Sequence, residues 1–330
     1  MPERALEALK QQALLQIHGL RVEYRTIEGV VHAVNGLDIT VLEGESLGLV
    51  GETGAGKTTT ALSIMQLVAN PPGKTTAGEV LYRGQDLRKK TDREMQKLRG
   101  NQISMIFQNP MASLNPVHTV GEQIMEVIRR HQKLNRKQAY EKAAEMLRMV
   151  GIPENRMMEY PYEFSGGMQQ RVSIAIALAC QPKLLIADEP TTALDVTIQA
   201  QVLELMKSLK KDFDSSLLLI THDFGLVAEL CDKVAVMYAG VVVESGTLEH
   251  IFNDPKHPYT IGLFQSIPKL DEAVERLIPI AGLSPDPKAL PMGCPFHPRC
   301  PHKQEVCAQR LPPPRDREGH FVSCWRYADE

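Results

Sequence analysis

Short apolar runs alternate with longer helix-forming stretches through the first 250 residues of the chain. Between 37 and 41 every second residue is apolar, which indicates a strand with one face exposed to water. Three short apolar runs are typical of strands buried on both faces, and they lie at 46–50, 184–187 and 217–220. The stretch 58–69 follows the first of these runs and is rich in good helix formers. This order predicts an α/β fold with a mostly parallel sheet.

The pattern changes twice further along the chain. Helical periodicity dominates at about 109–165, where we expect a helical insertion. Four of its apolar residues fall on one helical face at i, i+3, i+4 and i+7, namely Ala143, Met146, Leu147 and Val150. After Phe252 prolines become frequent and the periodicity is lost. We therefore predict a domain over 1–252 and an irregular C-terminal extension over 253–330.

Composition and charge exclude several classes of protein. The chain has 330 residues, of which 37 are Lys or Arg and 40 are Asp or Glu, so its net charge of −3 gives no overall basic field for nucleic acid. No apolar stretch approaches the roughly 20 residues that span a bilayer. The charged N-terminal segment MPERALEALKQQ lacks the apolar region of a signal peptide. We expect the chain to stay in the cytoplasm, where stable disulfides are rare.

A glycine-rich segment, GETGAGKTT, follows the strand predicted at 46–50 and matches the phosphate-loop pattern G-x-x-x-x-G-K-[ST]. Its residues are Gly51, Glu52, Thr53, Gly54, Ala55, Gly56, Lys57, Thr58 and Thr59. Such glycines let consecutive backbone N–H groups surround phosphate oxygens, and the next helix adds its partial positive charge. Lys57 supplies a charge for the β- and γ-phosphates, and the Thr58 hydroxyl suits Mg²⁺. The segment predicts a nucleoside triphosphate site and not an incidental glycine-rich turn.

Two adjacent carboxylates end the apolar run at 184–187, in the sequence LLIADEP. Asp188 at the end of a strand can hold Mg²⁺, directly or through water, and Glu189 can orient or deprotonate an attacking water. Acidic residues in this place also cap helices. Two of them after a buried strand, in a chain with a phosphate loop, favour phosphoryl transfer.

Three further segments resemble motifs of the ATP-binding cassette of ABC transporters. They are FSGGMQQR at 164–171, ADEPTTALD at 187–195 and ITHD at 220–223. Their order and spacing fit the cassette over residues 17–250, and the combination is far more specific than a phosphate loop alone. The resemblance implies an ABC-type P-loop NTPase fold, with a RecA-like α/β core, an antiparallel β part and the helical insertion.

The resemblance also implies roles for individual residues. Tyr24 would stack on the adenine ring, and Gln108 would contact Mg²⁺ and water and report to a membrane subunit. His222 would reach the γ-phosphate. Together with Glu189, the residues Gln108 and His222 form the expected catalytic set.

The signature residues would act on a neighbouring molecule. By the resemblance, Ser165, Gly166 and Gly167 close over ATP held by a second cassette, and Asp195 lies at the seam between the two. The common signature LSGGQ reads FSGGM here, a departure at Met168 that leaves the hydroxyl and both glycines in place. Since the chain has one phosphate loop, the second cassette must come from another chain.

Longer segments resemble the dipeptide and oligopeptide importers of this family, and the likeness covers nearly the whole chain. They lie at 109–128, 186–206 and 254–264. The likeness implies an ATPase that drives uptake from the cytoplasmic face of the membrane. Its implied partners are a second, non-identical ATP-binding subunit, two transmembrane permease subunits and an extracytoplasmic solute-binding protein. A homodimer of cassettes, and nickel or another small solute in place of peptides, remain alternatives.

Other classes of function fit the sequence less well. A soluble ABC ATPase of DNA repair would carry long coiled coils, and no sustained heptad run is present. A translation factor of this kind would carry two cassettes in one chain. A redox or metal sensor would leave the ATPase motifs unexplained.

Four of the six cysteines gather near the C-terminus, namely Cys294, Cys300, Cys307 and Cys324. We expect the other two, Cys180 and Cys231, to lie in the core. The four form a plausible set of metal ligands, but they lack the short C-x₂₋₄-C spacing of zinc sites, and iron–sulfur clusters tolerate wider spacing. The likeness to dipeptide importers implies a [4Fe–4S] cluster, with Zn²⁺ as the alternative. Substitute ligands would be His297, His302 and His320.

Overall fold

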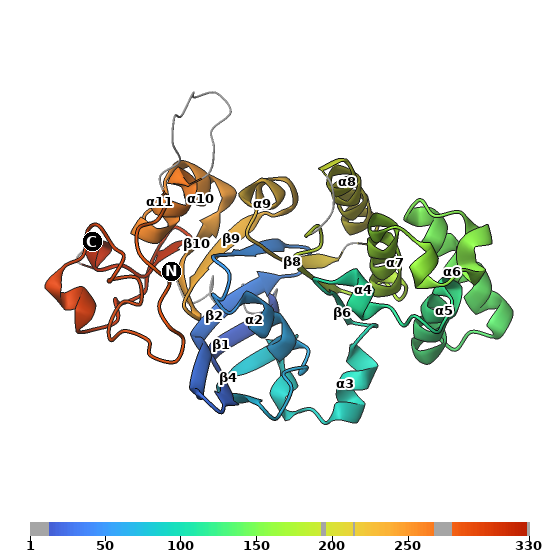
Figure 1. Ribbon diagram of the computed structural model, residues 1–330, viewed down its shortest axis with the longest axis horizontal. Helices are drawn as coiled ribbons and strands as arrows, with labels where there is room; N and C mark the ends of the chain where they lie inside the picture. The colour runs from blue at the N-terminus through green and yellow to red at the C-terminus, as the bar shows by residue number, and fades with distance from the viewer. Residues whose placement is uncertain (1–12, 193–195, 214, 267–278, 329–330) are drawn as a thin grey trace.

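Five parallel strands form one side of a large sheet in the computed structural model, which describes residues 13–192, 196–213, 215–266 and 279–328 (Figure 1). In order across the sheet they are β9 (Lys233–Tyr238), β3 (Ser46–Val50), β8 (Ser216–Thr221), β7 (Leu184–Asp188) and β6 (Ile103–Ile106). All residues of β3, β6, β7 and β8 are buried, as expected of strands covered on both faces. The strands predicted from the three short apolar runs are confirmed.

Three antiparallel strands continue this sheet beyond β9, giving eight strands among the described residues. They are β10 (Val241–Thr247), β12 (His320–Val322) and β11 (Arg315–Arg317). The last two belong to the extension that the sequence predicts to be irregular, so that prediction was wrong for this hairpin. Pairing of β12 with Glu244 and Ser245 of β10 provides the hydrogen-bonding partners that three-residue strands lack by themselves.

A helix in the extension, α11 (Pro258–Gln265), also departs from the irregular expectation. It follows α10 (Leu248–Asn253), which ends at the predicted domain boundary. Proline at the first position of α11 is compatible with a helix because its missing N–H would have no partner there. The fully buried Glu244 carboxylate accepts the backbone N–H groups of Lys256 and His257 and pairs with Nε2 of His320 at 2.8 Å. Glu244 thus ties two parts of the extension, at 256–257 and at His320, to the large sheet.

A smaller antiparallel sheet packs beside the large one. Its strands in spatial order are β2 (Gly29–Leu42), β1 (Ala13–Thr26), β4 (Gly73–Tyr82) and β5 (Gln85–Asp86). The alternating residues at 37–41 lie in β2, as predicted. Ile17 and Leu37 share one buried cluster with Leu49 and Met237 of the large sheet. This common core fixes the position of the phosphate loop between the two sheets.

The helices surround these sheets, and one group forms the predicted helical insertion, on the right in Figure 1. That group comprises α4 (Pro110–Ser113), α5 (Val120–His131) and α6 (Arg136–Met149), which pack beside α7 (Gly166–Leu178). The predicted apolar face of α6 is buried, as Ala143 and Leu147 illustrate. Capping boxes at Thr119 and Asn135 start α5 and α6.

The other helices follow strands of the two sheets along the chain. They are α2 (Lys57–Ile64), α3 (Asp92–Leu98), α8 (Val196–Phe213) and α9 (Phe224–Leu230). The 3₁₀ turns span Leu87–Lys89, Glu154–Met158, Pro161–Glu163, Glu305–Ala308 and Trp325–Tyr327. Helix α2 ends before the predicted residue 69, because Gln66 adopts a left-handed backbone with φ of 49°. In the described part of the chain, no helix is both long and apolar enough to cross a membrane.

Candidate nucleotide site

The loops that follow β3, β6, β7 and β8 meet at one edge of the large sheet, because these strands are parallel. Each loop carries a predicted site residue: Lys57 follows β3, Gln108 follows β6, Glu189 follows β7 and His222 follows β8. The predicted catalytic residues Gln108, Glu189 and His222 therefore lie at the same edge of the sheet.

The phosphate loop is packed too tightly to admit side chains at two of its glycines. A Cβ atom on Gly51 would lie 2.2 Å from the carbonyl oxygen of Met237, and one on Gly56 would lie 2.3 Å from that of Ala33. Gly56 also has a φ of 103°, which L-residues rarely adopt. The loop therefore depends on glycine for both its conformation and its closeness to β9 and β2.

Lys57 folds back on this loop. Its Nζ donates to the carbonyl oxygens of Gly51 at 2.7 Å and Glu52 at 3.0 Å, and the residue is 6% exposed. Burial lowers the pKa of Lys57, while the charges of Glu189 and Asp188 oppose that decrease. The ammonium group is thus held where a phosphate group bound by the loop would meet it.

Thr58 and Asp188 lie side by side. The Thr58 hydroxyl donates to Oδ1 of Asp188 at 3.2 Å, and Asp188 is only 1% exposed. Burial raises the pKa of Asp188, and the hydrogen bond from Thr58 limits the increase. A hydroxyl and a carboxylate are hard oxygen donors of the kind that Mg²⁺ prefers, so this pair fits the predicted magnesium ligands.

Glu189 is the centre of a polar cluster. Nε2 of Gln108 and the Thr192 hydroxyl each donate to its Oε2 at 2.9 Å, and Nδ1 of His222 lies 3.3 Å from Oε1. Burial alone would raise the pKa of Glu189, but hydrogen bonds from Thr192 and His222 hold it below its ordinary value. Its backbone has a φ of 46°, an uncommon conformation for a residue other than glycine. The carboxylate is therefore ionised and oriented, as a proton acceptor must be.

The other predicted nucleotide contacts lie around this cluster or on other elements. The half-buried Tyr24 of β1 places its hydroxyl 3.4 Å from that of Thr59. Ser165 caps α7 by accepting the N–H of Met168 at 3.4 Å, and Gly166 has open space around it. The signature thus starts a helix of its own, separate from the phosphate loop. Asp195 lies outside the described residues, as does the N-terminal segment 1–12.

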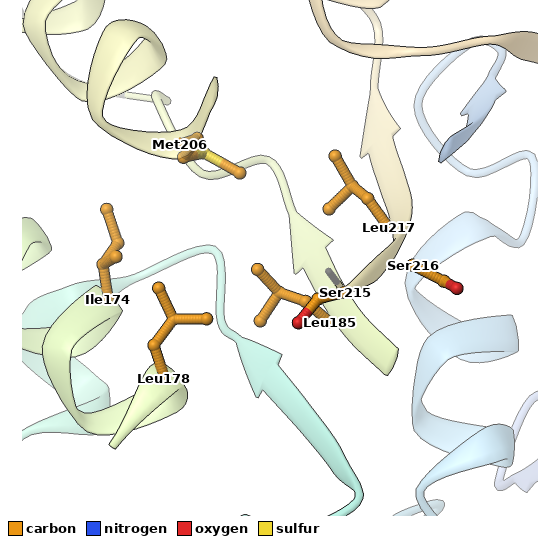
Figure 2. Close-up of a pocket in the computed structure, with 7 residues that line it drawn as sticks. All are labelled: Ile174, Leu178, Leu185, Met206, Ser215, Ser216 and Leu217. Carbon is orange, nitrogen blue, oxygen red and sulfur yellow. The ribbon is translucent and has the colours of Figure 1, made fainter. Parts of the chain in front are cut away.

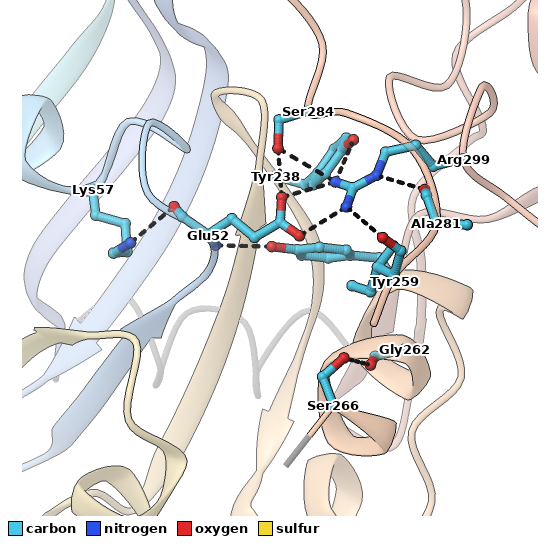
Figure 3. A network of polar contacts seen from close by, with 10 residues as sticks. Glu52, Lys57, Tyr238, Tyr259, Gly262, Ser266, Ala281, Ser284 and Arg299 are labelled. Carbon is cyan, nitrogen blue, oxygen red and sulfur yellow. Dashed lines mark hydrogen bonds and ion pairs between the residues drawn. The ribbon is translucent and has the colours of Figure 1, made fainter. Parts of the chain in front are cut away.

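Contacts from the extension, which the sequence did not predict, reach Glu52 of the phosphate loop (Figure 3). Arg299 forms a bidentate ion pair with its carboxylate, Ser284 donates to the same group, and Tyr259 accepts its backbone N–H. Burial alone would raise the pKa of Glu52, but hydrogen bonds from Arg299 and Ser284 hold it below the ordinary value. No local sequence pattern signals a pair separated by 247 positions.

A small hollow lies elsewhere in the fold, between α7, α8 and the adjoining strands (Figure 2). Its lining residues are Ile174, Leu178, Leu185, Met206, Ser215, Ser216 and Leu217. The hydroxyls of Ser215 and Ser216 already donate to the carbonyl oxygens of Pro182 and Leu42. An apolar hollow with its hydroxyls already bonded does not suit a nucleotide.

The cysteine-bearing part of the extension gives the predicted metal site less support. Cys294, Cys307 and Cys324 are buried, Cys300 is partly buried, and the N–H of Cys294 donates to the carbonyl of Cys307 at 2.8 Å. Within the described ranges, no group of three or more His, Cys, Asp or Glu side chains could hold a metal ion. The expected metal-binding character of the extension is therefore not supported by this geometry. Burial of Cys180 and Cys231 confirms their predicted place in the core.

Comparison with known proteins agrees with the site geometry. The sequence model of the family described as "ABC transporter" matches residues 34–192, and that described as "Oligopeptide/dipeptide transporter, C-terminal region" matches 243–307. The oligopeptide transport ATP-binding protein OppD of Escherichia coli is 47% identical over 99% of this chain and 98% of its own length. The chain belongs to the ABC transporter family.

Other relatives of this ABC transporter protein agree in sequence and fold. The oligopeptide transport ATP-binding protein AppD of Bacillus subtilis is 50% identical over 96% of this chain and 98% of its own. A solved structure described as a dimeric, post-hydrolysis state of the cassette MJ0796 with ADP and Pi has a TM-score of 0.64 and 28% identity. It covers 71% of this chain and 98% of that one. The predicted ABC cassette fold is confirmed, with mixed α/β sheets.

Proposed function

We propose that this ABC protein is the ATP-hydrolysing motor subunit of an importer of dipeptides or oligopeptides. The observation that carries the proposal is the cluster at the edge of the sheet, where Glu189 is held by Gln108, Thr192 and His222. Full-length similarity to oligopeptide transport ATP-binding proteins supports the choice of peptides as the solute.

Each residue of the cluster has a role in hydrolysis. Backbone N–H groups of the loop and the ammonium group of Lys57 bind the phosphates, after Lys57 releases the carbonyl oxygens of Gly51 and Glu52. Thr58 and Asp188 would hold Mg²⁺, whose charge offsets that of the phosphates. Glu189 accepts the proton of the attacking water, and His222 and Gln108 fix the orientation of its carboxylate. Tyr24 would stack on the adenine ring.

A second cassette completes the site. Ser165, Gly166 and Gly167 start a helix whose first N–H groups are suited to phosphate oxygens. They would face ATP held by the partner molecule. Asp195 would lie at the same seam. The dimeric cassette structure with ADP and Pi supports this arrangement. The second cassette is a related, non-identical chain, and the pair works on two permease subunits at the cytoplasmic face of the membrane, with an extracytoplasmic binding protein delivering the peptide.

Purification of the native complex tests these partners. A tagged copy of this chain should co-purify with a second ATP-binding subunit and two permeases, and peptide-loaded binding protein should raise the ATPase rate of the complex. Recovery with ribosomes or DNA, without permeases, would replace the transport function with that of a soluble ATPase.

A [4Fe–4S] cluster is the metal group that we propose for the extension. Burial raises the pKa of Cys294 to about 12, and the nearby thiols of Cys307, Cys324 and Cys300 add to the increase, which places all four within electrostatic reach. A cluster suits these four cysteines better than Zn²⁺, because their spacing lacks the short C-x₂₋₄-C pairs of zinc sites and iron–sulfur clusters tolerate wider spacing. Anaerobic purification should give brown protein containing iron and sulfide. Colourless protein with stoichiometric zinc would contradict this assignment.

A further inference from the structure

The extension fixes one residue of the phosphate loop at both of its polar ends (Figure 3). Nη1 of Arg299 donates to Oε2 of Glu52 at 2.8 Å, and Nη2 donates to Oε1 at 3.1 Å. The Ser284 hydroxyl donates to Oε2 at 2.6 Å. The backbone N–H of Glu52 donates to the Tyr259 hydroxyl at 2.9 Å. All three partners follow the predicted cassette domain in the sequence.

Arg299 is itself held rigidly. Its side chain is 7% exposed, its Nε donates to the carbonyl oxygen of Ala281 at 3.2 Å, and its Nη2 donates to that of Ile280 at 3.3 Å. Nη1 also reaches the Tyr238 hydroxyl at 3.3 Å. A planar guanidinium bonded on all sides presents its two remaining N–H groups to Glu52 in one orientation.

The segment that carries Arg299 is also the segment that carries two of the cysteines. Phe296 is buried with its ring centroid 5.2 Å from that of Tyr238 and 5.4 Å from that of Tyr259. Arg299 directly precedes Cys300. The order of the segment 294–300 therefore determines where the guanidinium lies.

The charge of Glu52 explains why its position matters for ATP. Glu52 is part of the loop that receives negatively charged phosphates, and its carbonyl oxygen accepts Nζ of Lys57 at 3.0 Å. An unpaired carboxylate here would repel the phosphates. The Arg299 guanidinium neutralises that charge and holds it away from the loop interior.

We propose that Arg299 is a positioning residue for ATP binding, through which the order of the segment 294–300 sets the affinity of the phosphate loop. This inference rests on the proposed ATPase function and adds a regulatory link between the extension and the nucleotide site. The link requires no change in Glu189 or in the other hydrolytic residues.

Equilibrium binding of a fluorescent ATP analogue with Mg²⁺ to the full-length chain tests the proposal. Arg299→Met should raise the Kd roughly five- to tenfold, in the range of ordinary coupling between sites. Arg310→Met removes an exposed arginine of the same extension and should leave the Kd unchanged. Arg299→Lys keeps the charge but not the fork, so its Kd should lie between those of wild type and Arg299→Met.

A double variant separates positioning of Glu52 from general damage to the extension. Glu52→Gln combined with Arg299→Met removes both charges, so it should bind the analogue more tightly than Arg299→Met alone. Amide hydrogen exchange at 51–57 should be faster in Arg299→Met than in Arg310→Met. If Arg299→Met does not fold, Arg299→Lys carries the test, with Arg310→Met as its control.

The outcomes separate this proposal from the proposed function. Wild-type protein that binds no nucleotide would contradict the function itself. Wild-type binding together with an unchanged Kd in Arg299→Met or Arg299→Lys would overturn the inference alone. A double variant that binds no more tightly than Arg299→Met would also overturn it, because the defect would then not pass through Glu52.

Discussion

His257 should make the stability of the chain depend on pH, and the structure shows why. It caps α11, where its Nδ1 accepts the N–H of Tyr259 at 3.1 Å, and it is 1% exposed. Burial lowers the pKa of His257 to about 4 from an ordinary 6.5, although the carboxylate of Glu244 opposes the decrease. The neutral ring is therefore the form that fits, because a protonated Nδ1 could not accept this hydrogen bond.

The sign and size of the effect follow from these two pKa values. Because the pKa of His257 is depressed in the folded chain, the unfolded chain binds more protons between pH 4 and 6.5. The stabilisation is complete above the unfolded pKa and is lost as the pH falls towards 4. Between about pH 7.5 and about pH 5.5 the loss in free energy of unfolding amounts to about 1.4 kcal/mol.

Urea unfolding of the nucleotide-free chain at these two pH values measures the loss. His257→Asn keeps a capping oxygen but cannot titrate, so it should lose about 1.4 kcal/mol less than wild type between the two pH values. His118→Asn changes a half-exposed histidine and should follow wild type. If His257→Asn and wild type lose the same free energy, His257 is not the neutral, buried cap described here.

Three further substitutions test the site and the core. Glu189→Gln should still bind ATP but should hydrolyse it about 10²- to 10⁴-fold more slowly than wild type in a phosphate-release assay. Glu229→Gln, which changes an exposed ion pair, should keep the wild-type rate. A wild-type rate in Glu189→Gln would show that Glu189 is not the base. Gly51→Ala should abolish equilibrium binding of the fluorescent ATP analogue, because its Cβ would lie 2.2 Å from the carbonyl oxygen of Met237. Wild-type affinity in this variant would refute the tight packing of the loop. Leu49→Ala should lower the free energy of unfolding by about 2–5 kcal/mol, because Leu49 is fully buried. Ile27 is fully exposed, so Ile27→Ala should lower it by less than about 0.5 kcal/mol. Equal losses in the two variants would contradict the assigned core.

The central fold could be predicted because its strands have a strong local signal. The apolar runs of β3, β7 and β8 read as buried strands from the sequence, and the phosphate loop follows β3 as predicted. The resemblance to the ABC cassette implied the catalytic set of Glu189, Gln108 and His222, and the structure brings these three side chains into contact. Local periodicity and the order of the motifs are therefore enough to predict most of the cassette fold.

The extension was less predictable because long-range contacts determine it. Strand β11 consists of three exposed charged residues and forms only by pairing with β12. The contact of Arg299 with Glu52 joins two loops that no local pattern connects. Thr192 was also missed as a partner of Glu189, since a threonine after the two carboxylates has no distinctive spacing.

Peptide uptake by the reconstituted complex tests the proposed function most directly. Proteoliposomes containing this chain, its partner cassette and the permeases, supplied with binding protein and a radiolabelled oligopeptide, should accumulate peptide when ATP is present on the cassette side. With Glu189→Gln in this chain, accumulation should fall to a small fraction of the wild-type rate while ATP still binds. Equal accumulation by the two complexes, or wild-type complexes that hydrolyse ATP without moving peptide, would contradict a peptide-import motor driven from Glu189.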